Sequence, residues 1–351
     1  MRGSLGGSSQ RISYGVRGRP GFQWKGDRLE KGTRVDLGVE LSGIALKNPI
    51  LVCSGTFGNG REYAEWMNLE ALGGLITKAV TLKPCAGNPP PRLWETPSGL
   101  LNSIGLENRG LEVFLEEDLP WLSRLDLPVW VNVAGFSEEE YVEAAREISR
   151  SGMADALELN ISCPNVKEGG IQFSSRPREA AGLVSLVREV ADIPLYVKLS
   201  PRATDIKGMA MAMEKAGADG LSLINTVPAM AVDVETGRPR LANITGGLSG
   251  PAIHPIAVMA VWEVSEVVGI PVIGMGGIWS WRDAVEMIMV GADAVAVGTL
   301  NFSNPGAPLE ILDGLTGYMA RKGVSGVSEL VDLTRERGLH KPSFDRRGGY
   351  A

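Results

Sequence analysis

The segment Leu157–Asn165, with the sequence LELNISCPN, is a short apolar run that ends in two asparagines on either side of a cysteine. Gly169 and Gly170 follow it closely. An apolar run that leads into a loop with Pro and Gly is typical of a buried parallel strand. The carboxyl ends of such strands carry the chemistry in α/β enzymes. A thiol at this position, Cys163, can act as a base.

An alternation of strand-like and helix-like segments continues on both sides of this run. Eight apolar runs have the length of a strand, and they are Pro49–Ser54, Gly74–Val80, Pro128–Ala134, Ala156–Ile161, Pro194–Ser200, Gly220–Thr226, Pro271–Gly276 and Ala294–Thr299. Amphipathic stretches of helical length lie between them. Eight such repeats in 351 residues favour a closed parallel barrel, the (β/α)8 TIM barrel, over an open doubly wound sheet.

Two of the amphipathic stretches carry clear helix signals. Ser137–Ser151 opens with a serine that can cap a helix, and Glu140 follows three residues later. Arg176–Ala191 has apolar residues at helical spacing. We expect its buried face to consist of Leu183, Leu186, Val187 and Val190.

Two connections are much longer than the others. Thr81–Arg109 is rich in proline and follows the second strand, and Val227–Gly250 is rich in glycine and follows the sixth. The loops that follow the strands of such a barrel build its binding site. We therefore expect both loops to form walls or lids over the mouth of the barrel.

The composition is that of a globular protein, with 44% hydrophobic residues. No apolar run reaches the roughly 18 residues of a membrane helix, and no secretory signal opens the chain, so we expect a cytoplasmic location. Three cysteines predict reduced thiols and are too few for an iron–sulfur cluster of the chain's own. His254 and His340 are the only histidines, and we expect no metal site.

The formal charge of −6 is distributed unevenly. Residues 1–34 carry eight basic and two acidic side chains, a net charge of +6, so the remainder carries −12. A start rich in Gly, Ser and Arg with few apolar residues predicts a disordered extension, although contact with nucleic acid or a role as transit peptide stays open. We expect the barrel to span residues 35–335 and a flexible tail to follow at 336–351. The acidic body is not typical of nucleic-acid binding.

Polar and small residues stand at the carboxyl ends of the predicted strands. Each alone has a plain explanation, because strand-end lysines usually reach solvent, single cysteines are usually buried filler and asparagines favour turns. Together they comprise Lys78, Asn132, Asn160, Cys163, Lys198, Asn225, Thr226 and the glycines of Gly274–Gly277 and Gly298. Glycines after the last two strands suit a phosphate held on backbone amides. The set predicts a site for a planar, amide-bearing, anionic ligand.

Five motifs in order resemble the class 1 dihydroorotate dehydrogenases. They are Asn102–Asn108 (NSIGLEN), Asn160–Asn165 (NISCPN), Tyr196–Pro201 (YVKLSP), Ala242–Pro251 (ANITGGLSGP) and Ile273–Ile278 (IGMGGI). The fourth motif is specifically similar to class 1B, the catalytic subunit of the NAD-linked enzyme. The resemblance covers roughly residues 34–331.

The resemblance implies an FMN-containing barrel that oxidises (S)-dihydroorotate to orotate in pyrimidine biosynthesis. Cys163 falls on the base that removes the C5 proton while hydride leaves C6 for FMN. The implied orotate contacts are Lys78, Asn102, Ser103, Ile104, Gly105, Leu106, Asn160, Asn225 and Thr226. The implied FMN contacts are Ser54, Lys78, Ala79, Asn132, Asn160, Lys198, Ile224, Gly250, Gly276, Gly277, Gly298 and Thr299.

The class 1B resemblance also implies a partner. It is an electron-transfer subunit that carries FAD and a 2Fe–2S cluster, bound to a homodimer of the catalytic chain within a heterotetramer. Three alternatives stay open at this point: a fumarate-linked class 1A enzyme, a flavoenzyme like dihydropyrimidine dehydrogenase, and a flavin-free barrel that binds a phosphorylated metabolite. Fold alone does not separate them.

Overall fold

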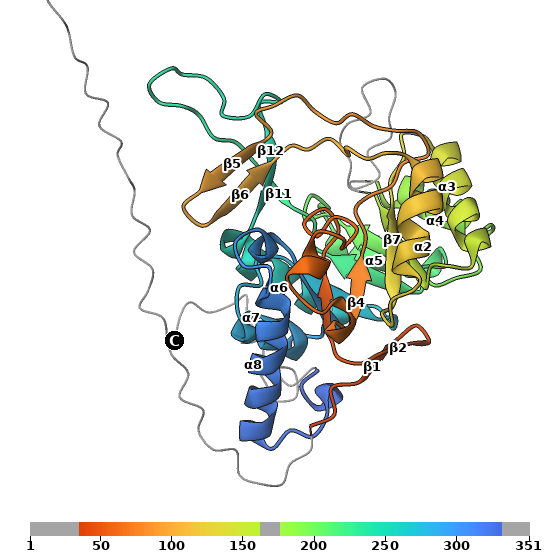
Figure 1. Cartoon of the computed structure of the whole chain (residues 1–351), viewed down its shortest axis with the longest axis vertical. Coiled ribbons are helices and arrows are strands. Elements are labelled where there is room, and N and C mark those ends of the chain that lie inside the picture. The colour runs from red at the N-terminus through yellow and green to blue at the C-terminus, as the bar shows by residue number, and fades with distance from the viewer. Residues whose placement is uncertain (1–34, 162–175, 332–351) are drawn as a thin grey trace, which may run out of the picture. The chain divides into compact units, whose positions relative to one another are not determined.

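Eight strands form a closed barrel in which every neighbouring pair is parallel (Figure 1). The computed structural model describes residues 35–161 and 176–331, so the predicted extension 1–34, the tail 336–351 and Cys163 lie outside the described residues. The strands are β3 (Ile50–Val52), β4 (Gly74–Ile76), β7 (Val129–Val133), β8 (Ala156–Asn160), β9 (Leu195–Leu199), β10 (Gly220–Leu223), β13 (Val272–Met275) and β14 (Ala294–Val297). Each lies within one predicted run, and the (β/α)8 barrel is confirmed.

Helices pack around the barrel. The longer ones are α3 (Glu138–Ser151), α4 (Pro177–Arg188), α5 (Ile206–Lys215), α6 (His254–Ser265), α7 (Trp281–Met289) and α8 (Ala307–Lys322). A helical segment before β7 consists of α1 (Leu111–Val113), a π-helical turn (Phe114–Asp118) and α2 (Leu119–Leu122). Short 3-10 turns occur at Tyr63–Glu65, Leu69–Ala71, Pro251–Ile253, Thr299–Phe302 and Val327–Glu329. The inner faces of the helices and the outward side chains of the strands form one apolar core.

The predicted signals for α3 are confirmed, whereas those for α4 are partly wrong. The Ser137 hydroxyl oxygen accepts a hydrogen bond from the Glu140 N–H at 3.3 Å, which caps α3. In α4 the fully buried residues are Ala180, Leu183, Val184 and Val187. They follow the i, i+3, i+4, i+7 stripe of one helix face, and Leu186 falls beside this stripe and is 39% exposed.

The barrel interior contains an apolar layer and, toward the carboxyl ends of the strands, a polar one. The rings of Trp130 on β7 and Tyr196 on β9 meet edge to face with centroids 5.8 Å apart. Side chains two residues further along a strand point to the same side. On β7, β8, β9 and β10, the next inward-pointing side chain toward the carboxyl end is polar and buried. These four residues are Asn132, Glu158, Lys198 and Ser222. We call this set the polar layer.

A hairpin lies at the amino end of the barrel. It consists of β1 (Val39–Leu41) and β2 (Ile44–Leu46), whose buried leucines Leu41 and Leu46 pack in one cluster with Trp130 and Tyr196. The Ser42 hydroxyl in its turn lies 2.9 Å from the Tyr196 hydroxyl. The apolar layer is therefore sealed on the side away from the polar layer.

The two long loops form a second sheet of four antiparallel strands. The strands are β5 (Leu93–Thr96), β6 (Gly99–Asn102), β11 (Val227–Ala229) and β12 (Gly246–Ser249), in the order β11-β12-β6-β5. Figure 1 shows this sheet at the end of the barrel to which β4 points. The loops were predicted as walls or lids, and their pairing with each other was not predicted.

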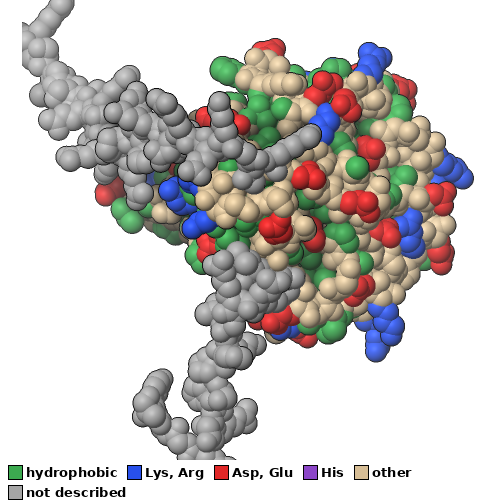
Figure 2. All heavy atoms as spheres, turned by 90° about the horizontal axis from the view of Figure 1, so that it is seen from below, with side chains coloured by type: hydrophobic (Ala, Val, Ile, Leu, Met, Phe, Trp, Pro, Cys, Tyr) green, Lys and Arg blue, Asp and Glu red, His purple; other side chains and the backbone are tan. Residues whose placement is uncertain are grey.

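The described surface carries charges of both signs. On the face shown in Figure 2, acidic and basic side chains are dispersed among apolar and neutral ones. A contiguous basic surface is the usual signature of nucleic-acid binding. Within residues 35–161 and 176–331, every helix is too short or too polar to cross a lipid bilayer.

Candidate active site

A cavity of about 500 Å³ opens between the carboxyl ends of the strands and the antiparallel sheet. Every residue that the resemblance assigns to orotate lines this cavity: Lys78, Asn102, Ser103, Ile104, Gly105, Leu106, Asn160, Asn225 and Thr226. Ser54, Ala79 and Lys198 line it as well. We call it the large cavity.

Two asparagines, one at the end of β8 and one just after β10, contact each other across β9 within the large cavity. The Asn225 side-chain amide donates to Asn160 Oδ1 at 3.4 Å, and the Asn225 Oδ1 accepts the N–H of Thr226 at 2.7 Å. The Tyr141 hydroxyl donates to the Asn160 carbonyl at 2.7 Å and anchors the end of β8. An amide offers both a donor and an acceptor, so this pair suits a ligand edge that alternates carbonyl and N–H groups.

The antiparallel sheet and the turn after β6 form the opposite wall. The Asn102 side-chain amide donates to the Gly247 carbonyl at 3.3 Å and links β6 to β12. The backbone at Gly105 has a φ of 74°, and Leu106, at 60°, lies in the left-handed region that favours glycine. The Cys85 thiol donates to the Gly105 carbonyl at 3.3 Å. This turn contributes Ile104, Gly105 and Leu106 to the lining of the large cavity.

A smaller cavity of about 80 Å³ adjoins the large one, with which it shares Ser54 and Lys198. The residues assigned to FMN that line it further are Ile224, Gly250, Gly276, Gly277, Gly298 and Thr299. A Cβ on Gly277 would lie 2.7 Å from the backbone nitrogen of His254 and 2.8 Å from the Gly250 carbonyl. Its φ of 70° likewise favours glycine. Only glycine at position 277 lets these backbone segments pack this closely, and we call the backbone at Gly250, Gly276 and Gly277 the glycine cradle.

The polar layer lies at the base of these cavities through Lys198. Lys198 donates to the Ser54 hydroxyl at 2.8 Å and pairs with Glu158 at 3.4 Å. The Asn132 amide nitrogen donates to the same Glu158 oxygen, and the Asn132 Oδ1 is buried without a hydrogen-bond partner among the described residues. Asn132 lines neither cavity, unlike the other predicted FMN residues.

A second thiol, Cys53, lies at the wall of the smaller cavity. It donates to the Ala296 carbonyl at 3.1 Å. Burial raises the pKa of the Cys53 thiol to about 12, and Glu158 adds to this while Lys198 opposes it. The group therefore stays protonated at neutral pH and cannot serve as a base.

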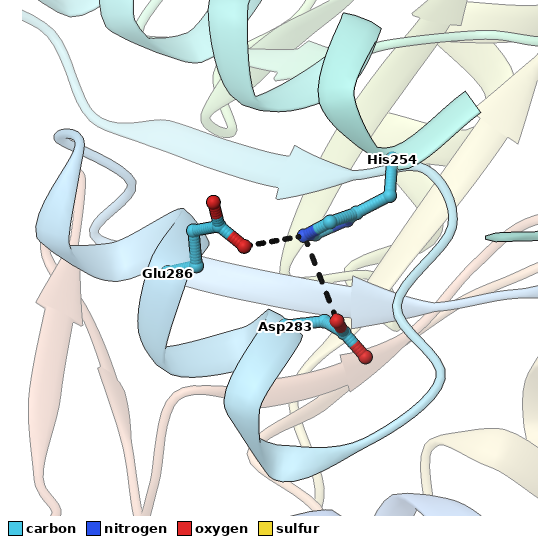
Figure 3. Close-up of side chains that lie close together, drawn as sticks. All are labelled: His254, Asp283 and Glu286. Atoms are coloured by element: carbon cyan, nitrogen blue, oxygen red, sulfur yellow. Dashed lines mark hydrogen bonds and ion pairs between the residues drawn. The ribbon is translucent and has the colours of Figure 1, made fainter. Parts of the chain in front are cut away.

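His254, at the start of α6, connects the glycine turn after β13 to α7 (Figure 3). Its Nδ1 lies 3.0 Å from the Gly276 carbonyl oxygen and so carries a hydrogen. Its Nε2 lies 3.3 Å from a Glu286 oxygen and 3.8 Å from an Asp283 oxygen. The ligand atoms of His254, Asp283 and Glu286 lie close enough together to hold a divalent cation.

Some residues of the site were not predicted. Those that line the large cavity include Thr56, Arg202 and Phe302, and Glu158 supports Lys198 from below. Glu158 carried a usable signal, since it is a single charge inside the apolar run of β8. Arg202 and Phe302 lie in turns after strands, where side-chain direction does not follow from the sequence pattern.

Comparison with known proteins decides the family. The family model described as dihydroorotate dehydrogenase matches residues 36–319, which is most of the chain. The chain belongs to the dihydroorotate dehydrogenase family. A protein of Geobacillus kaustophilus named dihydroorotate dehydrogenase B (NAD(+)), catalytic subunit, is 53% identical over 304 residues, which cover 87% of this chain and 97% of that protein.

Further relatives agree with this family assignment. A protein of the same name from Geotalea daltonii is 52% identical over 296 residues, 84% of this chain and 97% of that one. The crystal structure of a DHODH from Eimeria tenella in complex with ferulenol has a TM-score of 0.72 and 22% identity, and covers 86% of this chain and 89% of that chain. At that identity the likeness shows the fold alone. The predicted resemblance to the class 1B dihydroorotate dehydrogenases is confirmed.

Proposed function

We propose that this chain is the FMN-binding catalytic subunit of an NAD-linked dihydroorotate dehydrogenase, which oxidises (S)-dihydroorotate to orotate in pyrimidine biosynthesis. The observation that carries the proposal is the convergence of every described residue assigned to orotate on one cavity. Its polar groups meet the requirements of orotate, a flat ring with imide N–H groups, carbonyls and a carboxylate. Asn160 and Asn225 pair with the ring edge, and Lys78 balances the carboxylate charge.

The residues present fit FMN. The glycine cradle at Gly250, Gly276 and Gly277 lines the smaller cavity, where its backbone can approach a phosphate closely, and Thr299 adds a hydroxyl. The buried Asn132 Oδ1 offers an acceptor, and Lys198 offers a positive charge at the base of the mouth. FMN, when bound, supplies the acceptor for the hydride that leaves C6 of the substrate.

Cys163 is proposed as the base for the C5 proton. It lies outside the described residues, and it follows Asn160, the last residue of β8 and a wall of the large cavity, by three positions. Proton removal from carbon needs a positioned base. A cysteine near its reference pKa of about 8.5 is mostly thiol at neutral pH, so the rate should rise with pH.

We further propose that the electrons reach NAD through a partner subunit with FAD and a 2Fe–2S cluster, on a homodimer of this chain. The relatives that are 52–53% identical to this chain are named as catalytic subunits of an NAD(+) enzyme, which supports the existence of a second subunit. The sparse cysteines support a reducing, cytoplasmic location. In sequence, residues 1–34 precede the barrel as a proposed disordered extension, and residues 336–351 follow it as a proposed flexible tail.

The test of the proposed function is an anaerobic titration of the purified, FMN-loaded chain with dihydroorotate and, separately, with dihydrouracil. We expect dihydroorotate to bleach the visible flavin spectrum and dihydrouracil to leave it unchanged. Bleaching by dihydrouracil alone would instead favour a dihydropyrimidine dehydrogenase-like enzyme. A chain that takes up no FMN would favour the phosphometabolite-binding barrel.

Replacement of Lys198 by alanine should weaken FMN retention or lower the reduction potential of the bound flavin. The substitution removes the positive charge that stabilises an electron-rich ring and leaves Glu158 buried without its cation. Flavin content after gel filtration and titration against a reference dye measure both effects. Lys78→Ala is the matched comparison and should weaken orotate binding. Unchanged flavin content and potential in Lys198→Ala would show that this lysine does not serve the flavin.

Replacement of Gly277 by alanine should lower the affinity for FMN at least about tenfold, because the added Cβ would meet two backbone segments of the cradle. Quenching of FMN fluorescence on addition of the apoprotein measures the affinity. Gly182→Ala on α4 is the control, since nothing lies within 4 Å of its Cβ position. Native FMN affinity in Gly277→Ala would remove the cradle from the phosphate site.

A further inference from the structure

Glu158 is a carboxylate buried inside the barrel, with a side chain that is 1% exposed. One oxygen accepts the Asn132 amide and lies 3.4 Å from the Lys198 ammonium. The other accepts the Ser222 hydroxyl at 2.6 Å. Its partners come from β7, β9 and β10, so this one side chain ties together four consecutive strands of the barrel.

The charge balance of the polar layer rests on the pair of Glu158 and Lys198. Asn132 and Ser222 are neutral, and the neighbouring Cys53 stays a neutral thiol because burial raises its pKa to about 12. Lys198 is itself 6% exposed and also touches Ser54, which lines both cavities. Among the described residues, the carboxylate that pairs with this positive charge is Glu158, directly beneath the mouth.

The negative charge of Glu158 is not explained by stability or by hydrogen bonding. Taking two charges out of water is unfavourable, and well-packed neutral side chains in their place are often as stable. A glutamine has an oxygen for the Asn132 amide, and a serine hydroxyl can donate or accept. The hydrogen bonds alone thus do not require a negative charge at this position. A negative charge is required to offset the electrostatic potential that Lys198 creates at the mouth of the barrel.

We propose that Glu158 is a positioning residue that sets the reduction potential of bound FMN through Lys198. This inference rests on the proposed function. Glu158 holds the ammonium in place and offsets part of its charge, so that Lys198 stabilises the electron-rich ring only in part. The bound flavin is thereby kept from holding its electrons too tightly, which favours their onward transfer.

The test compares three variants of the FMN-loaded full chain. Glu158→Gln keeps the shape of the side chain and removes its charge. We expect its affinity for reduced FMN, relative to oxidised FMN, to rise about tenfold, which corresponds to a potential about 30 mV more positive for two electrons. Glu158→Asp retains the charge and should stay near the native potential. Ser222→Ala removes the 2.6 Å hydrogen bond to Glu158 but leaves both charges of the pair in place, and its potential should also stay near the native value.

The outcomes separate this inference from the proposed function. A native or lower reduction potential in Glu158→Gln, or an equal shift of the potential in Ser222→Ala, overturns this inference. The proposed function still stands in that case if dihydroorotate bleaches the flavin spectrum. A chain that binds no FMN overturns both.

Infrared difference spectra keep the inference testable if Glu158→Gln does not fold. In native holoenzyme labelled with 13C-glutamate, a buried carboxylate band should shift when the flavin is reduced. The band should persist in Glu107→Gln, which removes the glutamate that lines the large cavity among the described residues. Absence of the band, or its loss in that variant, overturns the proposal.

Discussion

Replacement of Cys163 by alanine is expected to slow the reduction of bound FMN by dihydroorotate by roughly two to four orders of magnitude, the usual effect of losing a positioned acid–base group. FMN binding should persist, because none of the glycines, asparagines or lysines of the cavities is altered. Stopped-flow absorbance of the flavin under anaerobic conditions measures the rate directly. Cys163→Ser should keep a small part of the activity.

The other two cysteines give the controls for this experiment. Cys85→Ser retains a hydrogen-bond donor for the Gly105 carbonyl and should reduce its flavin at close to the native rate. Cys53 lines the smaller cavity, and its thiol pKa of about 12 makes it unfit as a base, so it cannot substitute for Cys163. A near-native rate in Cys163→Ala would show that another group takes the proton.

The purified chain, loaded with FMN, is expected to oxidise dihydroorotate with an artificial dye and to give essentially no turnover with NAD. The sequence has no dinucleotide fingerprint, and its three cysteines are too few for an iron–sulfur cluster that would carry electrons outward. Steady-state assays with dye, NAD and fumarate, with and without a flavin and iron–sulfur partner, measure the prediction.

Each acceptor has a distinct meaning in that assay. Dye activity without NAD activity, restored by the partner protein, is the expected pattern. Rapid NAD reduction by the single chain would contradict the need for a partner. Efficient use of fumarate would point instead to the class 1A type of enzyme.

The barrel and most of its contacts could be predicted because local patterns fix them. Each inner strand is a short apolar run, and its carboxyl end in a parallel barrel must lie at the common mouth. Lys78, Asn160 and Lys198 therefore converge as predicted once the strand count is right. The family motifs then supplied residues such as Asn102 and Leu106, whose positions depend on a loop that periodicity does not describe.

The features that were missed depend on long-range geometry. The pairing of β6 with β12 joins two loops that each look irregular, and the strands are short. His254 and Glu286 meet because α6 and α7 pack side by side, which the spacing of the residues does not reveal. Leu186 was placed on the wrong face because the apolar stripe of α4 is set by Ala180 and Val184 as much as by leucines.

The antiparallel sheet pairs segments that are synthesised far apart in time. Asn102 and Gly247, which it joins, are 145 residues apart in the chain. Contacts this distant in sequence repay the entropy of loop closure only after intervening segments are ordered. A growing chain can therefore complete the roof of the cavity only after β12 has been synthesised, although β6 is made much earlier.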